Sequence, residues 1–194
     1  MEYGEVSFRK GVKTDVEAVV ELLKERCRWM DRKGIQQWNN EGYLSFYNHN
    51  YFSSKAANGE LYVAEIGEKI VGMFVLLEKD KRWNDDIPSY YLHNFTTDPE
   101  IKGLGEKILK YCEKKAIQDG KERFRLDCGV KSKELNDYYE SRGFVFVGIC
   151  DESPYYIGNR REKKLVKIIF KYKVWVADKS PLFLHLFYKK EKLL

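Results

Sequence analysis

The sequence predicts an α/β (α+β) protein built around a strand, a crossover helix and a second strand. Residues 90–97 are rich in β-branched and aromatic side chains, which favour a strand, and Pro99 ends it because proline cannot donate to a ladder. An apolar residue then recurs every fourth position and marks one face of a helix: Leu104, Ile108, Cys112 and Ala116. Residues 124–128 predict the second strand. A strand–helix–strand of this length forms a parallel, right-handed central βαβ unit.

Two glycines stand where this helix begins. Gly103 and Gly105 leave the backbone N–H groups accessible, and the positive end of the helix favours an anion there. Lys102 and Lys107 add positive charge. A glycine pair is also common in a plain helix-start turn, but its position after a strand and before a striped helix favours an anion site.

The N-terminal third predicts a strand, a long helix and a hairpin. Residues 6–10 alternate as an edge strand, and Thr14 with Glu17 has the spacing of a capping box. A buried stripe follows from Val16 to Met30, and Gly34 is the expected stop. The remaining expected elements are a helix over 43–52, strands over 61–66 and 70–77 joined by a tight turn, and a polar loop over 83–88.

The C-terminal third predicts a short helix and two strands. Ser132 is expected to cap a helix over 133–142, which Gly143 ends in a left-handed conformation. Strands are expected over 144–149 and 165–172, with a loop at 151–154 between them. From residue 173 the chain is too apolar for a free linker. We therefore expect one domain over 1–172, and an extension over 173–194 packed on it or on a partner subunit, which leaves a homodimer open.

Composition indicates a soluble globular protein. The chain has 194 residues, of which 43% are hydrophobic and 34% charged, enough for one well-buried domain. The four cysteines are far apart and form no Cys-x-x-Cys pair, so no zinc or redox motif and no metal is expected. No apolar run approaches the about 18 residues of a membrane span. A cytoplasmic protein with reduced thiols is the simplest interpretation.

The net charge of +5 is unevenly distributed. Residues 160–194 hold eleven Lys or Arg against three Asp or Glu, a net +8, so the preceding residues carry a net −3. A basic tail can bind nucleic acid, but this one lacks any repeat or motif, and we favour a solvated basic face. The acidic remainder suits a partner that carries an amine.

Two motifs resemble the GCN5-related N-acetyltransferase (GNAT) family. Gly103 and Gly105 match the family's phosphate loop, and Tyr139, Gly143 and Phe144 match its Tyr-x-x-x-Gly-Phe signature. The resemblance extends from about Val6 to about Ile149. Glu100 stands where the family has Arg or Gln, and the loop before Gly103 is short.

The resemblance implies a mixed, mostly antiparallel sheet with splayed strands, flanked by helices. It also implies an acyltransferase that moves an acetyl group from acetyl-CoA, directly and in a ternary complex, to a primary amine of a small molecule or of a peptide or protein N-terminus. The alternative is a non-catalytic module that binds acyl-CoA on the same fold.

The resemblance also assigns the coenzyme A contacts. Backbone groups of Phe95, Thr96 and Thr97 would hold the pantetheine arm. The residues at the helix start would hold the diphosphate: Lys102, Gly103, Leu104, Gly105, Glu106 and Lys107. Ser132 stands where relatives carry a cofactor-binding asparagine, and Asn136, one helical turn on, is the expected substitute.

Tyr139 is the expected general acid, since a phenol can donate to the departing thiolate; a core tyrosine is the competing interpretation. Asp127 is the expected general base, with His93, Asn94 or a water relay left as alternatives. Candidates for the acceptor pocket are Trp38, Glu41, Tyr43, Asp85 and Asp86.

Overall fold

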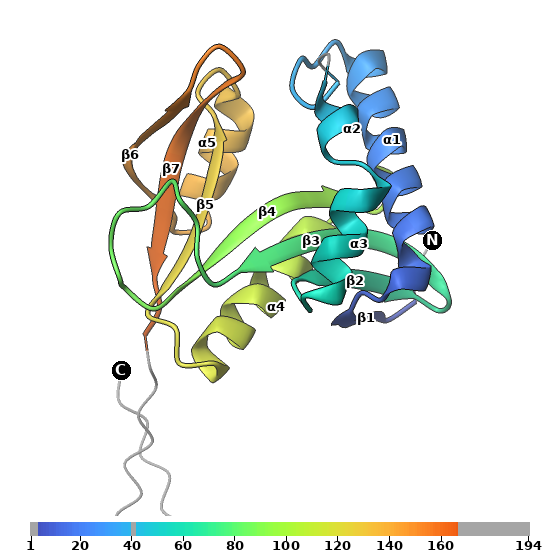
Figure 1. Cartoon of the computed structure of the whole chain (residues 1–194), viewed down its shortest axis with the longest axis horizontal. Helices are drawn as coiled ribbons and strands as arrows, with labels where there is room; N and C mark the ends of the chain where they lie inside the picture. The colour runs from blue at the N-terminus through green and yellow to red at the C-terminus, as the bar shows by residue number, and fades with distance from the viewer. Residues whose placement is uncertain (1–3, 40–41, 167–194) are drawn as a thin grey trace, which may run out of the picture.

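A computed structural model describes residues 4–39 and 42–166 (Figure 1). The described strands form one sheet in the order β1-β2-β3-β4-β5-β7-β6. Their bounds are β1 Val6–Lys10, β2 Leu61–Ile66, β3 Lys69–Leu77, β4 Ser89–Thr97, β5 Arg123–Gly129, β6 Val145–Glu152 and β7 Tyr156–Lys164. Within the described chain β4 and β5 pair in parallel and the other neighbours are antiparallel, so the predicted fold class is confirmed.

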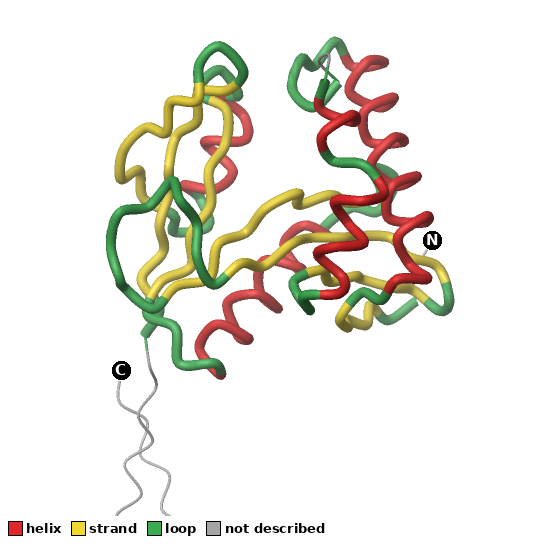
Figure 2. The backbone as a smooth tube through the Cα atoms, viewed as in Figure 1, coloured by secondary structure: helices red, strands yellow, loops and turns green. Residues whose placement is uncertain are grey.

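Helices lie on both faces of the sheet (Figure 2). Their bounds are α1 Val16–Lys33, α2 Tyr43–Phe46, α3 His49–Ala57, α4 Leu104–Gln118 and α5 Lys133–Glu140. Side chains of a strand alternate between faces. Accordingly Leu61 and Val63 of β2 pack in one cluster with α1 and α3, whereas Tyr62 and Ala64 pack in a second cluster with α4. The predicted apolar stripe of α4 is buried in that second cluster.

Helix ends depart from the expected caps in two places. The predicted Thr14–Glu17 capping box is wrong: the carboxylate of Asp15 accepts from the Val12 amide at 2.8 Å, because a short 3₁₀ turn over Lys13–Asp15 precedes α1. The predicted helix over 43–52 is broken at Tyr47 into α2 and α3. The αL stop at Gly34 is confirmed, with φ of 66°.

The C-terminal strand is the main correction to the fold. A β6–β7 hairpin occupies residues 145–164, and the strand expected over 165–172 is wrong where it is described, because Leu165 and Val166 follow the end of β7. The apolar pattern missed β7 because its buried side chains are charged. Arg161 is 6% and Glu162 9% exposed, and Glu162 is held by Arg123 and Arg125.

The extension expected over 173–194 lies outside the described residues, and the domain division stays a prediction. All four cysteines are buried and unpaired, which agrees with reduced thiols. Across residues 4–39 and 42–166, the helices are all too short or too polar to cross a membrane.

Candidate functional site

The sheet opens between β4 and β5, and we call this opening the fork. The last parallel pair joins Leu92 to Leu126. Beyond it β4 continues to Thr97 and β5 to Gly129 with no ladder between them, and the two strands diverge (Figure 1). An extended ligand can therefore enter the fork and pair with backbone groups as an added strand would.

A bulge in β4 lies at the base of the fork. Asn94 has a φ of 48°, and the β3–β4 register shifts opposite it. The Asn94 side chain donates from Nδ2 to the Tyr43 hydroxyl at 3.3 Å and accepts at Oδ1 from the Tyr51 hydroxyl at 3.0 Å. A left-handed residue other than glycine is uncommon and persists when its surroundings fix it. Tyr43 of α2 and Tyr51 of α3 thus hold the β4 backbone in the conformation that opens the fork.

The start of α4 presents unused backbone donors beside the fork. The first bond into the helix runs from the Lys107 amide to the Gly103 carbonyl at 3.3 Å, and no described backbone carbonyl accepts from the amides of 102–106. Gly103 is left-handed, with φ of 78°. Lys102 and Lys107 are exposed, whereas the Leu104 side chain is buried in the core, so only the Leu104 backbone can face a ligand. These donors can hold an anion.

Gly105 is closely covered by two aromatic side chains. A Cβ added there would lie 3.3 Å from the Tyr138 hydroxyl and 3.5 Å from the Phe95 ring. The Arg142 guanidinium stacks over the Tyr138 ring at 4.6 Å and reaches the Glu106 carboxylate at 3.4 Å. Arg142 Nε is buried without a partner in the described structure. A cation therefore stands at the start of α4, supplied by the turn that follows α5.

The predicted pantetheine contacts lie along β4. Thr96 is buried, and its hydroxyl donates to the Asn94 carbonyl at 3.1 Å, which supports the bulge. Thr97 is half-buried and pairs with Gly72 of β3. The Thr96 side chain is therefore structural, and at Thr96 only the backbone is available to a ligand.

The Tyr139 side chain is buried in this structure. It is 6% exposed and packs edge-on against Phe144, at a ring-centroid distance of 5.8 Å. Burial, and to a lesser extent the neighbouring Cys128, raises the pKa of the Tyr139 phenol well above its ordinary value. The phenol is therefore a neutral O–H near neutral pH.

Asp127 lies just past the fork's last pair, on β5, and its carboxylate is fully engaged. Oδ1 accepts from Arg82 at 3.0 Å and Oδ2 accepts from the Tyr156 hydroxyl at 2.6 Å. Arg82 also binds Glu152 at 2.7 Å. Burial, together with the charge of Asp127, raises the pKa of Tyr156 far above its ordinary value. Asp127 is thus the centre of an ion-pair network, and each of its oxygens already accepts a hydrogen bond.

His93 lies at the matching position on β4. Its Nε2 is 2.8 Å from Oδ2 of Asp80, a residue of the β3–β4 loop. One ligand atom each of Asp80, His93 and Asp127 lies within 4.8 Å of the others, a spacing that a metal ion could use. Arg82 and Tyr156 already bind Asp127, however, and a guanidinium in contact disfavours a cation. The arrangement fits a hydrogen-bonded charge network better than a metal centre.

Hydrogen bonds of Asn136 connect α5 to the sheet and to the residue that precedes α5, Ser132. Asn136 Nδ2 donates to the carbonyls of Gly129 at 3.0 Å and Ser132 at 2.9 Å. Its Oδ1 accepts from Asn159 at 2.9 Å and from Arg161 at 3.0 Å. The Ser132 hydroxyl makes no cap bond, contrary to expectation. Both polar atoms of the Asn136 side chain are therefore hydrogen-bonded to other groups of the protein.

The model of the acetyltransferase (GNAT) family matches residues 17–144. This chain belongs to the GNAT family. No curated protein sequence matches it.

Solved GNAT structures agree in fold. A GNAT acetyltransferase from Listeria monocytogenes superposes with a TM-score of 0.69 at 21% identity, covering 85% of this chain and 99% of the other. The PaiA N-acetyltransferase of Thermoplasma acidophilum, in complex with coenzyme A, gives 0.65 at 18% identity, covering 82% and 99%. Ard1 of Thermoplasma volcanium gives 0.62 at 13%, covering 83% and 98%.

Four polar residues around the fork and the start of α4 were missed from the sequence: Asp80, Arg82, Arg142 and Tyr156. Arg82 and Tyr156 meet Asp127 from 45 and 29 residues away. The only signal in the sequence was the residue types: Arg82, Asp80 and Asp85 lie in the polar loop before the central strand. Nothing in the spacing of such residues predicts their pairing.

A buried arginine holds the β3–β4 loop of this GNAT in place. Arg125 binds both carboxylate oxygens of Asp85, at 2.8 and 2.9 Å, and stacks over Trp83 at 4.5 Å. Asp85, a candidate for the acceptor pocket, thus fastens the loop that carries Asp80 and Arg82. Asp86 is exposed.

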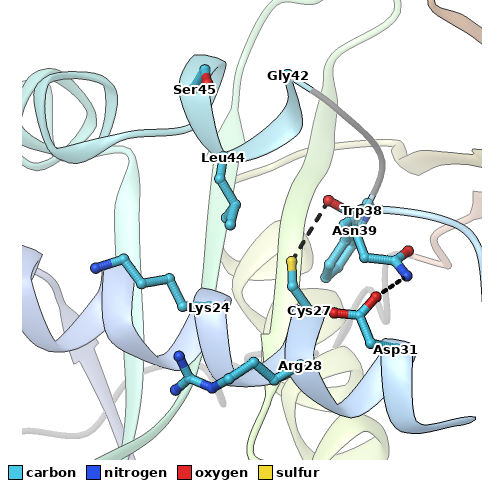
Figure 3. A pocket seen from close by; sticks show the side chains of 9 residues that line it. All are labelled: Lys24, Cys27, Arg28, Asp31, Trp38, Asn39, Gly42, Leu44 and Ser45. Carbon is cyan, nitrogen blue, oxygen red and sulfur yellow. Dashed lines mark hydrogen bonds between the residues drawn. The ribbon is translucent and has the colours of Figure 1, made fainter.

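A cavity of about 440 Å³ opens between α1 and the segment around Trp38 (Figure 3). The Cys27 thiol donates to the Trp38 carbonyl at 3.6 Å, and Asn39 donates to Asp31 at 2.7 Å. Trp38 stacks on Tyr43 at 5.5 Å, which connects this wall to the β4 bulge. Glu41, another candidate for the acceptor pocket, lies outside the described residues.

Proposed function

We propose that this protein is an acetyl-CoA-dependent N-acetyltransferase that moves the acetyl group directly to a primary amine in a ternary complex. The observation that carries the proposal is the fork, which ends its pairing at Leu92 and Leu126 beside the unused amides of 102–106. Pantetheine is a strand-like chain and diphosphate is an anion, so one molecule that joins them suits both features.

The diphosphate is bound by the amides of 102–106 together with Arg142. Glu100 lies in the approach to this helix start, where it offers no positive charge. The Arg142 guanidinium, in the turn after α5, supplies the positive charge instead, and its long 3.4 Å contact with Glu106 leaves it able to turn to a phosphate. Lys102 and Lys107 add screened surface charge. The peptide groups of Phe95, Thr96 and Thr97 bind pantetheine.

Tyr139 stabilises the departing thiolate. Because burial holds its pKa far above that of an ordinary thiol, about 8.5, the O–H favours hydrogen bonding to the thiolate over complete proton transfer. A hydrogen bond to a charged group contributes about 1.5–3 kcal/mol. Tyr139→Phe should therefore lower kcat by about 10- to 150-fold, whereas Tyr138→Phe, at the helix start, should change acetyl-CoA affinity instead.

Calorimetric titration with acetyl-CoA tests the cofactor site, with Gly103→Asp and Gly120→Asp as a matched pair. Both glycines are left-handed, with φ of 78° and 74°, and a Cβ at either meets nothing within 4 Å. They flank opposite ends of α4, so the backbone strain is alike and only Gly103→Asp puts a negative charge at the anion site. Loss of binding in Gly103→Asp alone supports the proposal; equal losses in both contradict it.

Thiol release in the presence of amines tests transfer. The amines are a diamine, a polyamine, an arylalkylamine and a peptide with a free N-terminus. Acetyl-CoA binding without thiol release from any of them favours the alternative, a non-catalytic acyl-CoA-binding module. The engagement of Asp127 by Arg82 and Tyr156, which leaves no free carboxylate at the fork, is the observation that favours this alternative.

A further inference from the structure

The base of the fork carries a histidine whose free nitrogen is fixed by its partner. His93 and Asp127 are the first residues beyond the last parallel pair, on β4 and β5 respectively. His93 also precedes the left-handed Asn94, so it sits where the strand leaves regular pairing. In the proposed binding mode, with the diphosphate at 102–106 and pantetheine along the backbone of residues 95–97, the thioester end of acetyl-CoA reaches the base of the fork.

Asp80 decides which imidazole nitrogen carries the proton. Its Oδ2 lies 2.8 Å from His93 Nε2, and its Oδ1 accepts from the Arg82 amide at 2.9 Å. Burial alone would raise the pKa of Asp80, but the bonds from His93 and Arg82 outweigh it and hold the pKa below the ordinary value. Asp80 is therefore a carboxylate and only accepts, so Nε2 must be the donor.

The other imidazole nitrogen then has a lone pair. The imidazole of His93 has no further hydrogen-bond partner in the described structure, and its side chain is 16% exposed. The charged and titratable groups around it are Asp80 and Arg82 of the β3–β4 loop, Asp127 of β5, Glu152 of β6, Tyr156 of β7 and Tyr51 of α3. Among these, His93 alone has a basic nitrogen that takes part in no ion pair or hydrogen bond of the described structure.

We propose that His93 is the general base of the acetyl transfer and that Asp80 is its positioning residue. The inference rests on the proposed function and deepens it, since Asp127 was the base expected from the sequence. It implies that the acceptor is an amine that arrives as the ammonium ion, from which His93 takes a proton.

The step balances as follows. His93 Nδ1 takes one proton from the ammonium ion, and the freed amine attacks the thioester carbonyl carbon. The nitrogen–carbon bond forms, the carbon–sulfur bond breaks, and the sulfur leaves with the electron pair. The second nitrogen-bound proton passes to the thiolate, and His93 returns its proton to solvent. The products are the amide, the coenzyme A thiol and one proton.

The experiment compares the pH dependence of kcat/KM for the full-length parent, His93→Gln, Asp80→Asn and the control His49→Gln. His49 is an exposed histidine of α3 bonded to Ser53, away from the fork. General-base catalysis contributes about 10²–10⁴-fold, so His93→Gln should lose that much and also lose the acidic limb of the profile. Asp80→Asn should lose less and keep a limb, and His49→Gln should match the parent.

Nitrogen-15 NMR of the imidazoles gives a readout independent of turnover. The parent should contain His93 as the Nε2–H tautomer, and Asp80→Asn should change that signature while acetyl-CoA affinity by calorimetry stays the same. A parent that acetylates amines with a His93→Gln rate within about threefold across the pH range, or an Nδ1–H tautomer, overturns the role of His93 only. A parent that acetylates none of the amines refutes the proposed function, and this role with it.

Discussion

Replacing Arg125 with methionine tests how the loop that supplies Asp80 and Arg82 is fixed. The Arg125 side chain is 2% exposed and binds Glu162 at 2.7 Å, Asp85 at 2.8 and 2.9 Å and the Tyr91 hydroxyl at 3.0 Å. Methionine keeps much of the apolar volume and removes every charged bond.

The expected cost follows from the exposure of the two carboxylates. Removing one partner of a buried ion pair costs about 3–5 kcal/mol. Asp85 is 39% exposed and can return to water, so it adds little, while Glu162 is 11% exposed but keeps Arg123 at 2.9 Å. We therefore expect the low end, about 3 kcal/mol in the free energy of unfolding, or about 6–12 °C in Tm.

Urea unfolding measures this cost, and Arg123→Met is the matched control. Arg123 binds the same Glu162 but is 20% exposed, so its loss should cost less than the loss of Arg125. In the double variant Arg125→Met/Glu162→Gln, the second change should cost less than it does alone, because the buried charge it removes has already lost a partner. Equal costs for the two arginines, or strict additivity, would refute this reasoning. Acetyl transfer should also fall in Arg125→Met, although Arg125 does not touch the fork.

Three further changes probe other parts of the molecule. Gly105→Ala should weaken acetyl-CoA binding by calorimetry, because its Cβ meets the Tyr138 hydroxyl at 3.3 Å; unchanged affinity would contradict close packing at the helix start. Asn94→Ala should be less stable than Asn94→Gly by about 1 kcal/mol in urea unfolding, because alanine resists a φ of 48°; equal stability would remove the strain argument. The hydrogen bond from Arg9 lowers the pKa of Asp15, so this pair stabilises the fold above the unfolded pKa of about 3.9 and loses that contribution as pH falls through the folded pKa. The stability difference between the parent and Asp15→Asn should therefore shrink in acid, and a difference that is constant with pH would contradict this.

The sequence by itself determined the central βαβ unit, because the spacing of apolar residues and the positions of glycine and proline are local properties of the chain. The apolar stripe of α4 needs only residues four apart, and Gly103 marks the helix start through its own backbone freedom. The same motifs gave the family, and with it the mostly antiparallel sheet.

Tertiary structure decided the polar chemistry at the fork. Asp127 looked like an available base until Arg82 and Tyr156, distant in the sequence, were found to bind it. His93 was only one of several alternatives for the base, and the structure distinguishes it because Asp80 binds one of its nitrogens and leaves the other without a partner among the described residues. Charge pairing depends on which side chains the fold brings within about 3 Å, and it produces no repeating pattern in the sequence. For the same reason β7, whose buried side chains are ion-paired, escaped a search for apolar alternation.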